Sequence, residues 1–198
     1  MTRPTSATRP KPQSIEAIEK VALELFRERG FEETPVEDIA AAAGISRRTF
    51  FRYFGSKNDI LFGNFDLLLR DLEEWLASAP EDQPMFAVIA DATMQFNRVH
   101  TDGAVAHRER MELILHTPAL RANAALRNAE WAAVVARYAA RRMHAPTDDL
   151  GPQLVGHVAL GAASAAYEQW LLDESSDLDA LVHRAFTMLQ ALPHLGTP

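Results

Sequence analysis

The chain has 198 residues, of which 47% are hydrophobic and 24% are charged, and its formal net charge is -7. This apolar content excludes a wholly disordered chain and suffices for one domain, or for a small domain joined to a larger one. The chain has no cysteine, which excludes disulfides, cysteine-ligated zinc and thiol catalysis. No apolar run reaches the roughly 18 residues of a membrane-spanning helix. The basic N-terminus lacks the apolar stretch of a secretory signal, so a cytoplasmic protein is expected.

The acidic charge is unevenly distributed along the chain. Residues 1–60 contain ten Lys or Arg and nine Asp or Glu, whereas residues 61–198 contain ten and eighteen. Residues 45–58 contain four basic side chains and no acidic one. Such an asymmetry indicates a local contact with nucleic acid better than the total charge does.

The first predicted elements are a tail and a helix. Residues 1–13 are rich in Pro, Thr, Arg and Lys, which predicts a disordered basic tail. Apolar residues then recur at helical spacing between a capping Ser14 and a terminating Gly30, which predicts a helix over residues 15–29. The tail cations could reach a DNA groove or belong to a merely flexible segment, and both interpretations stay open for Arg3, Arg9 and Lys11.

Two short helices are predicted next, over residues 36–43 and 47–54. Thr34 and Pro35 precede the first as a cap and as a proline suited to the first helical position. Gly44 ends this helix and permits the left-handed backbone of a tight turn. Ser46 then caps the second helix.

Helical periodicity continues to the end of the chain, with a turn at Thr101, Asp102 and Gly103. We find no strand and no internal repeat, so the predicted fold is all-α with about nine helices. The remaining predicted helices cover residues 56–76, 85–99, 104–116, 118–144, 150–172 and, after a capping Asp177, 178–192.

The segment TPVEDIAAAAGISRRTFFRYFGSK, residues 34–57, combines a short helix, a glycine turn and a short basic and aromatic helix. This order is typical of a helix-turn-helix. Its apolar positions are spaced to face the core, namely Ile39, Ile45, Phe50 and Phe54. The opposite face can donate to guanine and phosphate and contact a thymine methyl, through Arg47, Arg48, Thr49, Phe51 and Arg52. The alternative is a basic helix that is only solvated.

From Leu25 to Lys57 the chain resembles, without a gap, the TetR family of one-component transcriptional regulators. The resemblance rests on the phrases LFRERGFEETPVEDIAAAAGIS and YFGSK. It implies binding of double-stranded operator DNA, with Thr34, Tyr53 and Lys57 at phosphate-contacting positions. The recognition-helix positions are then Ser46, Arg47, Arg48, Thr49, Phe51 and Arg52. Phe51 stands where the family usually has Tyr, and it lacks that hydroxyl donor.

The resemblance also implies a homodimer on a palindromic operator, joined by the last two long helices of each subunit. The expected parts are therefore the tail 1–13, a helix-turn-helix DNA-binding domain 14–56 and a ligand-binding and dimerisation domain 57–198. Packing within one chain is the alternative role of the residues assigned to the interface. These are Gly156, Ala159, Gly161, Ala162, Ala163 and Ala166 in one helix and Leu178, Leu181, Val182, Ala185, Phe186 and Leu189 in the other.

The family usually has a ligand cavity between these helices. Ordinary core packing is the alternative for each candidate lining residue. The candidates are Trp75, Phe86, Phe96, Met111, Leu115, Trp131, Val135, Tyr138, Tyr167 and Trp170.

A narrower resemblance concerns the effector. The phrases RRTFFRYFGSKND, HRERMELILHTPAL and SAAYEQWLLDES are similar to regulators associated with the mycofactocin system. This implies a fatty acyl-CoA effector, with Arg108, Arg110 and Arg121 available to its phosphates. Residues 60–66 depart from that subgroup, because the expected Pro and Trp are missing.

The sequence contains no glycine-rich phosphate loop and no nucleophile elbow, so neither an enzyme nor a cofactor is expected. Glu112 and His116 could form a metal pair on one helical face, but no third ligand stands at motif spacing, and no metal is expected. The leading interpretation is a ligand-responsive repressor in which the helix over residues 56–76 couples effector to DNA. The alternative is a helical acyl-CoA or lipid carrier, or an enzyme, without specific DNA binding.

Overall fold

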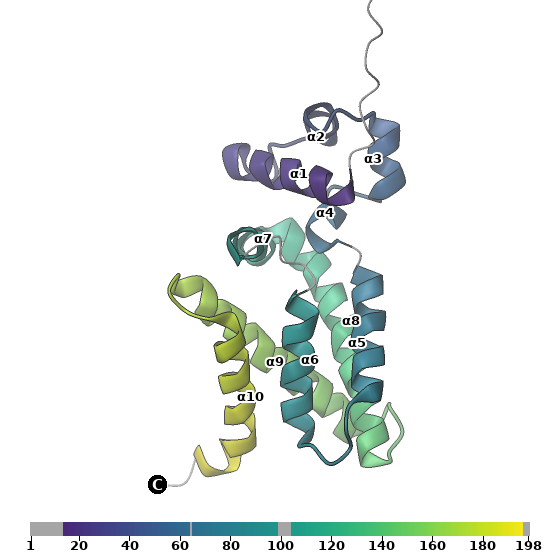
Figure 1. Ribbon diagram of the computed structural model, residues 1–198, viewed down its shortest axis with the longest axis vertical. Coiled ribbons are helices and arrows are strands. Elements are labelled where there is room, and N and C mark those ends of the chain that lie inside the picture. The colour runs from purple at the N-terminus through teal and green to yellow at the C-terminus, as the bar shows by residue number, and fades with distance from the viewer. Residues whose placement is uncertain (1–13, 64, 99–103, 196–198) are drawn as a thin grey trace, which may run out of the picture. The chain divides into compact units, whose positions relative to one another are not determined.

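A computed structural model describes residues 14–63, 65–98 and 104–195. Within these ranges the chain forms ten helices and no strand, which confirms the all-α prediction (Figure 1). The predicted tail, residues 1–13, and the turn at Thr101, Asp102 and Gly103 lie outside the described residues. None of the described helices combines the length and the apolar character that crossing a membrane requires.

The chain divides into two compact units, Met1–Gly63 and Asn64–Pro198. The boundary between them falls at Gly63 and Asn64, rather than at residue 56, where we expected the DNA-binding domain to end. The two units are therefore described separately below.

Among its described residues the first unit contains four helices, and the first of them begins and ends at the predicted Ser14 and Gly30. The predicted cap by Thr34 is wrong, because Pro35 takes the N-cap position of the helix Val36–Ala42 and no side chain caps it. The Ser14 hydroxyl accepts from the Ala17 amide at 3.2 Å, and Gly30 leaves the first helix with a φ of 86°. The apolar side chains of these helices form the interior of the unit, led by Ile18, Phe26, Ile39, Phe50 and Ile60. The helices are α1 (Ile15–Arg29), α2 (Val36–Ala42), α3 (Arg47–Tyr53) and α4 (Asp59–Phe62).

The turn between α2 and α3 depends on Gly44. Its φ of 65° lies in the left-handed region, where a side chain would crowd the following carbonyl. The Ile45 amide donates to the Ala40 carbonyl at 2.9 Å, which closes the end of α2. The predicted tight turn is therefore confirmed.

The second unit contains six helices that bury a shared apolar core. α8 and α9 form its most extensive pair, α10 packs on α6 and α9, and α5 packs on α6 and α8 (Figure 1). The core includes Leu76, Val88, Ile89, Val135 and Phe186, all nearly inaccessible to solvent. The helices are α5 (Phe65–Ser78), α6 (Met85–Arg98), α7 (Ala104–His116), α8 (Pro118–Met143), α9 (Leu150–Leu172) and α10 (Leu178–Leu195).

The prediction of a single helix over residues 56–76 is wrong. The segment forms two helices, α4 and α5, and Gly63 ends the first with φ 56° and ψ -148°. This backbone conformation is essentially restricted to glycine, so helical hydrogen bonding cannot continue through it. Ser56 does not cap a long helix either, because its hydroxyl donates to the Asp59 carboxylate at 3.0 Å. The described residues of this segment therefore do not form the continuous helix that we expected to couple effector to DNA.

The small residues of α9 serve packing within the chain. A Cβ built at Gly156 would lie 2.5 Å from the carbonyl oxygen of Ala132 in α8. Of the set assigned to the subunit interface, only Gly161 is exposed on α9, while Val182 and Phe186 of α10 are buried in the core of this chain. The intramolecular alternative therefore holds for the buried members, because α8 and α6 already cover them. They are Gly156, Ala159, Ala162, Ala163, Ala166, Val182 and Phe186.

Replacing Gly156 with Ala is expected to destabilise the second unit. Forcing a methyl group against the α8 backbone costs about 1–3 kcal/mol, and the better helix propensity of Ala returns roughly 1 kcal/mol of it. Urea unfolding followed by tryptophan fluorescence at a fixed protomer concentration measures the difference, because all three tryptophans lie in this unit.

Gly151→Ala is the matched control. Its added methyl meets the terminal methyl carbon of Met143 at 2.6 Å, and this flexible side chain can move away. We expect Gly151→Ala to unfold at or above the wild-type urea concentration. If Gly156→Ala also unfolds at or above the wild-type urea concentration, the conclusion that α8 and α9 approach closely at this glycine is wrong.

Candidate functional site

α3 is fixed in place by the residue that caps its start and by the buried aromatic side chain at its middle. The Ser46 hydroxyl accepts from the Thr49 amide at 3.0 Å and lies 2.9 Å from the Thr49 hydroxyl, so it caps the helix. Phe50 is fully buried, and its ring lies 5.3 Å from that of Phe54. The helix therefore has one face fixed in the core, and its other face carries Arg47, Arg48, Phe51 and Arg52, all exposed.

The arginines of this exposed face differ in their surroundings. Arg47 forms an ion pair with Glu37 of α2, with 2.8 Å between Nε and Oε1, and its guanidinium carbon lies 5.1 Å from the centre of the Phe51 ring. Arg52 donates to the Tyr53 hydroxyl at 3.2 Å and lies over that ring. Arg48 is exposed and forms no ion pair or ring contact with any described residue.

The side chains at two expected phosphate-contacting positions form contacts inside the unit. Thr34 is completely buried, and its hydroxyl donates to the Gly30 carbonyl at 2.7 Å. The Lys57 ammonium donates to the Phe31 carbonyl at 2.6 Å and lies 4.2 Å from the centre of the Phe31 ring. The Thr34 side chain therefore faces the interior, and Lys57 ties the segment after α3 to the segment before α2.

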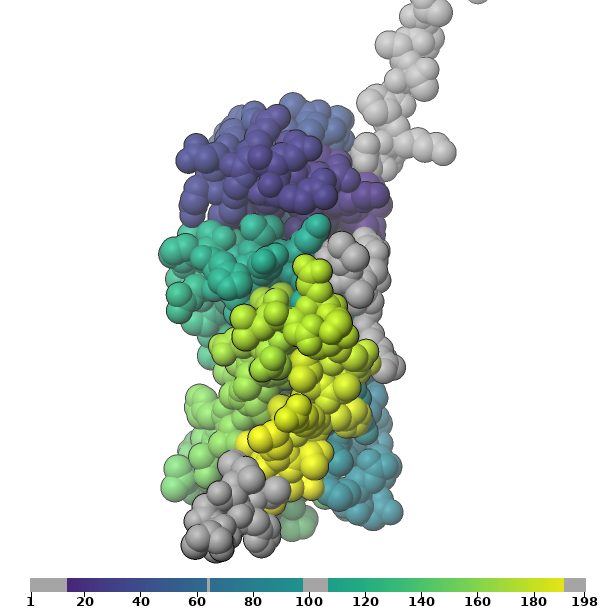
Figure 2. All heavy atoms as spheres, turned by 90° about the vertical axis from the view of Figure 1, so that its left-hand side faces the viewer, coloured from purple at the N-terminus to yellow at the C-terminus, as the bar shows by residue number. Residues whose placement is uncertain are grey.

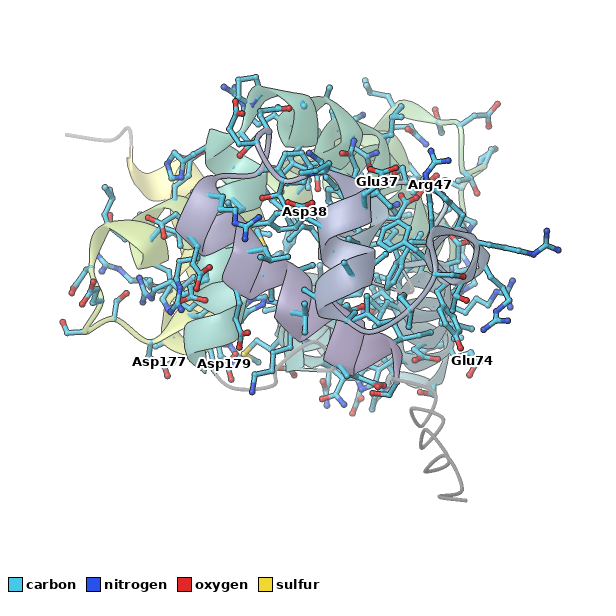
Figure 3. The ribbon with its side chains drawn as sticks, turned by 90° about the horizontal axis from the view of Figure 1, so that it is seen from above. Glu37, Asp38, Arg47, Glu74, Asp177 and Asp179 are labelled. Atoms are coloured by element: carbon cyan, nitrogen blue, oxygen red, sulfur yellow. The ribbon has the colours of Figure 1, made fainter. Side chains whose placement is uncertain are left out.

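Sequence reasoning missed two acidic residues close to this surface. Glu37 contacts Arg47, and its neighbour Asp38 accepts from Arg29 of α1 at 2.8 Å. In the view of Figure 3, Glu37 and Arg47 lie together while Asp38 lies apart from them. The sequence signal was an acidic first turn in α2, which usually reflects only the helix dipole.

Six of the ten candidate ligand-lining residues belong to the core of the second unit. Trp131, Val135 and Tyr138 are buried in the main apolar cluster, and three others pack against it half-buried. The core-packing alternative therefore accounts for these six without a ligand. The half-buried three are Trp75, Phe86 and Phe96.

Tyr167 and Trp170 form a separate group with a histidine of α7. The ring of His107 lies 5.9 Å from that of Tyr167 and 5.4 Å from that of Trp170, and the Tyr167 hydroxyl is 3.3 Å from Nε2 of His107. Burial raises the pKa of Tyr167 well above its ordinary value, and the nearby Asp179 carboxylate raises this pKa further. The phenol therefore keeps its proton and remains a hydrogen-bond donor at physiological pH.

The three arginines expected near an acyl-CoA headgroup are not equivalent. Arg108 donates to the carbonyl oxygens of Trp170 and Asp173 and stacks over the Trp170 ring, so it closes the C-terminal end of α9. Arg110 is buried, whereas Arg121 of α8 is exposed. Only Arg121 of the three is therefore open to a solvated phosphate.

The remaining candidates, Met111 and Leu115, are half-buried on α7. On the same helix, His116 directs Nδ1 at the carbonyl oxygen of Glu112 at 3.0 Å, rather than forming a metal pair with its carboxylate. Within the described ranges no three His, Asp or Glu side chains gather closely enough to hold a metal ion.

A stripe of exposed apolar and small residues, interrupted by His157 and Glu168, runs along the outer face of α9. Leu150, Leu154 and Leu172 expose 78%, 56% and 82% of their surface, and the small residues Gly161 and Ala165 lie between them. On α10, Met188 is also exposed. Figure 2 looks onto the side of the second unit that carries α10 and the end of α9.

Both units match known families and known proteins. Residues 18–63 match the family model of tetR-family bacterial regulatory proteins, and residues 83–192 match that of the MftR C-terminal domain. A protein of Mycobacterium tuberculosis named as the mycofactocin biosynthesis transcriptional regulator MftR is 41% identical over 88% of each chain.

Two solved structures share the fold. FadR of Bacillus subtilis, in complex with stearoyl-CoA, has a TM-score of 0.65 at 19% identity, covering 89% of this chain and 97% of its own. FadR of Thermus thermophilus, in complex with lauroyl-CoA, has a TM-score of 0.55 at 24% identity, covering 89% and 93%.

The evidence from sequence, geometry and comparison agrees. A capped helix with a buried aromatic face and an exposed arginine face follows a glycine turn, and the family models cover this unit and most of the next. Such proteins regulate transcription and are not enzymes. The chain belongs to the TetR family of bacterial regulatory proteins and is a helix-turn-helix transcriptional regulator with a C-terminal domain of the MftR type.

Proposed function

We propose that the protein is a cytoplasmic repressor that binds a palindromic operator as a homodimer through the exposed face of α3. The observation that carries this proposal is that face itself, where Arg47, Arg48 and Arg52 stand exposed while Phe50 anchors the helix in the core. Recognition helices read base edges mainly with their N-terminal residues. Arg47 and Arg48 are the first two residues of α3 and are therefore the proposed base-reading pair.

The proposed phosphate contacts come from residues around this face. Arg52 and Tyr53 lie at the end of α3, and the Ser46 and Thr49 hydroxyls lie at its start. Lys57 keeps part of its donor capacity for a phosphate, because an ammonium carries three protons. Phe51 is 42% exposed and offers an apolar contact suited to a thymine methyl.

The exposed stripe on α9, together with Met188 of α10, is the proposed dimer interface. Reading a palindrome requires two recognition helices about 34–36 Å apart, and one chain supplies only one. The stripe combines large apolar side chains with Gly161 and Ala165, so a partner helix could approach closely between leucines.

The proposed effector is a long-chain fatty acyl-CoA. Support comes from the likeness to MftR and from the FadR structures that hold stearoyl-CoA and lauroyl-CoA. We place the acyl chain near Met111, Leu115, Tyr167 and Trp170, which lie outside the main apolar cluster. Such a ligand changes DNA affinity only if it binds the two conformations of the protein unequally.

Replacing Arg48 or Arg47 with Ala is expected to weaken specific binding by about 1–3 kcal/mol each. The measurement is fluorescence anisotropy with the DNA fragment upstream of the gene and with a scrambled duplex, across a salt series. Affinity for both duplexes should fall steeply with salt, because phosphate contacts release counterions.

Arg70→Ala is the control for loss of one positive charge, because Arg70 lies exposed on α5 in the other unit. It should bind the upstream fragment like the wild type. Wild-type affinity in both α3 variants would show that this helix does not read the operator. If neither this fragment nor other promoters are preferred over scrambled DNA, the proposed reading of a specific operator through α3 is wrong.

Long-chain acyl-CoA is expected to raise the unfolding midpoint of the protein and to change its affinity for the upstream fragment. A ligand at a hundred times its Kd stabilises the folded state by about 2.7 kcal/mol. Differential scanning fluorimetry with stearoyl-CoA, stearate and free CoA in parallel separates the contributions of chain and headgroup. The absence of any shift with stearoyl-CoA would contradict this effector class and leave the regulator assignment intact.

Arg121→Ala is expected to weaken stearoyl-CoA binding by roughly three- to tenfold, since a hydrogen bond to a charged group contributes about 1.5–3 kcal/mol when desolvated and less when exposed. Stearate affinity should not change, because the fatty acid carries no phosphate. Isothermal titration calorimetry measures both affinities. An equal loss for both ligands would mean that Arg121 supports the fold rather than the headgroup.

A further inference from the structure

Arg47 is braced from two sides, unlike the other arginines of α3. The Glu37 carboxylate, from α2, forms an ion pair with Arg47 in which Oε1 lies 2.8 Å from Nε, and the Phe51 ring lies beneath the guanidinium carbon at 5.1 Å. Arg52 contacts only its own neighbour Tyr53, and Arg48 has no such contact in the described part of the chain. Among the described contacts of the α3 arginines, only that of Arg47 therefore joins α3 to α2.

The position of the Glu37 carboxylate determines which N–H groups of Arg47 remain available to a second partner. A guanidinium has five N–H groups in a fixed fork, one on Nε and four on the two terminal nitrogens. Because the Glu37 carboxylate lies beside Nε, the edge formed by the terminal Nη1 and Nη2 remains for another partner. Guanine offers two neighbouring acceptors in the major groove, N7 and O6, and a guanidinium edge with two parallel N–H groups matches them.

Phe51 restricts the guanidinium in a second way. The ring attracts the cation above it, and an edge-on contact with Phe50 at 5.3 Å limits the movement of the ring itself. Each exposed contact alone shifts a side-chain population by no more than about fivefold. Acting on one guanidinium from different directions, the two contacts reinforce each other.

Glu37 also places a negative charge beside a surface that must approach phosphates. Its side chain is 59% exposed, so it repels the phosphates of any duplex. A duplex without a guanine near Arg47 has no hydrogen bond to offset this repulsion. A guanine at the right position would accept hydrogen bonds from Nη1 and Nη2 of Arg47, while the repulsion between Glu37 and the phosphates would be the same for every duplex. The same carboxylate can therefore orient the reader and lower non-specific affinity.

We propose that Glu37 is a positioning residue that, with Phe51, presets Arg47 to read one guanine in each half-site through Nη1 and Nη2. This inference rests on the proposed function, because it requires sequence-specific binding by α3. It adds a specificity determinant that lies outside the recognition helix and does not itself contact a base.

Three variants separate orientation from charge. Glu37→Ala removes both the acceptor and the negative charge, whereas Glu37→Gln removes the charge and keeps an oxygen that can accept from Nε. Asp38→Asn is the matched control, because Asp38 is the adjacent carboxylate of α2 and pairs at the same 2.8 Å with Arg29 of α1 rather than with α3. Thermal unfolding of each full-length variant checks that the fold is kept.

The experiment begins with selection from a random duplex library by the full-length wild type. Each guanine of the enriched sequence is then replaced in turn by 7-deazaguanine, which lacks the N7 acceptor, and affinity is measured by anisotropy. For wild type, Glu37→Gln and Asp38→Asn, we expect one guanine per half-site at which the replacement costs about tenfold, since a bidentate contact discriminates by about 1–3 kcal/mol. For Glu37→Ala the same replacement should cost less than about twofold, because Arg47 is no longer preset.

Affinity for a scrambled duplex provides the second measurement. It should rise to a similar extent in Glu37→Ala, Glu37→Gln and Asp38→Asn, because each loses one negative charge. The ratio of affinity for the enriched sequence to affinity for the scrambled duplex should fall further in Glu37→Ala than in the other two variants.

Two results overturn the inference, and they are distinguishable. If the library yields an enriched sequence but Glu37→Ala keeps the wild-type penalty at every guanine, or Asp38→Asn loses it equally, Glu37 does not position Arg47 and the regulator stands. If no sequence is enriched, specific DNA binding itself fails, and the proposed function falls with the inference.

Discussion

The seven residues of α3 must satisfy two demands at once, since one face has to hold the helix in its unit while the other stays open to a ligand. An isolated helix of this length is not stable in water, so tertiary contacts must supply its order. Phe50, fully buried, and Phe54 provide the anchor, and Ser46 satisfies an amide at the first turn. Because the anchor occupies the apolar positions, the arginines are left on the outer face.

The surroundings of α3 follow from this constraint. Gly44 supplies the left-handed turn that lets α2 and α3 share one core. Lys57 then draws the chain after α3 back to Phe31, which explains why a residue at a phosphate-contacting position is partly used within the protein. Glu37 stands across the turn from Arg47, so a single ion pair connects α2 to an arginine on the exposed face of α3.

The second unit is organised by a different interaction, the close contact of α8 and α9 at Gly156. Ion pairs and caps surround the core that this contact creates. Arg137 of α8 forms an ion pair with Glu73 of α5 at 2.8 Å, and this hydrogen-bonded guanidinium lowers the pKa of Glu73 despite partial desolvation. The polar group of His107, Tyr167 and Arg108 lies outside the main apolar cluster and connects α7 to α9.

Much of this protein was determined locally and could be derived from the sequence. Ser14, Ser46 and Asp177 cap helices as expected, α9 has the predicted bounds, and the alternation of Phe50 and Phe54 with arginines identified the recognition helix. These features depend on neighbours within a few residues, so the order of residue types carries them. The dimer assignment of Gly156 and Phe186 failed because apolar periodicity tells which face is buried, but not whether the covering helix belongs to the same chain.

Only the tertiary structure decided the rest. It ended α4 at Gly63, turned the Thr34 hydroxyl inward to Gly30 and brought Glu37 to Arg47. Each of these outcomes depends on a backbone dihedral or on a contact across a turn. Sequence spacing restricts such contacts but does not specify them, because a long side chain reaches several partners and the relative positions of the helices select one.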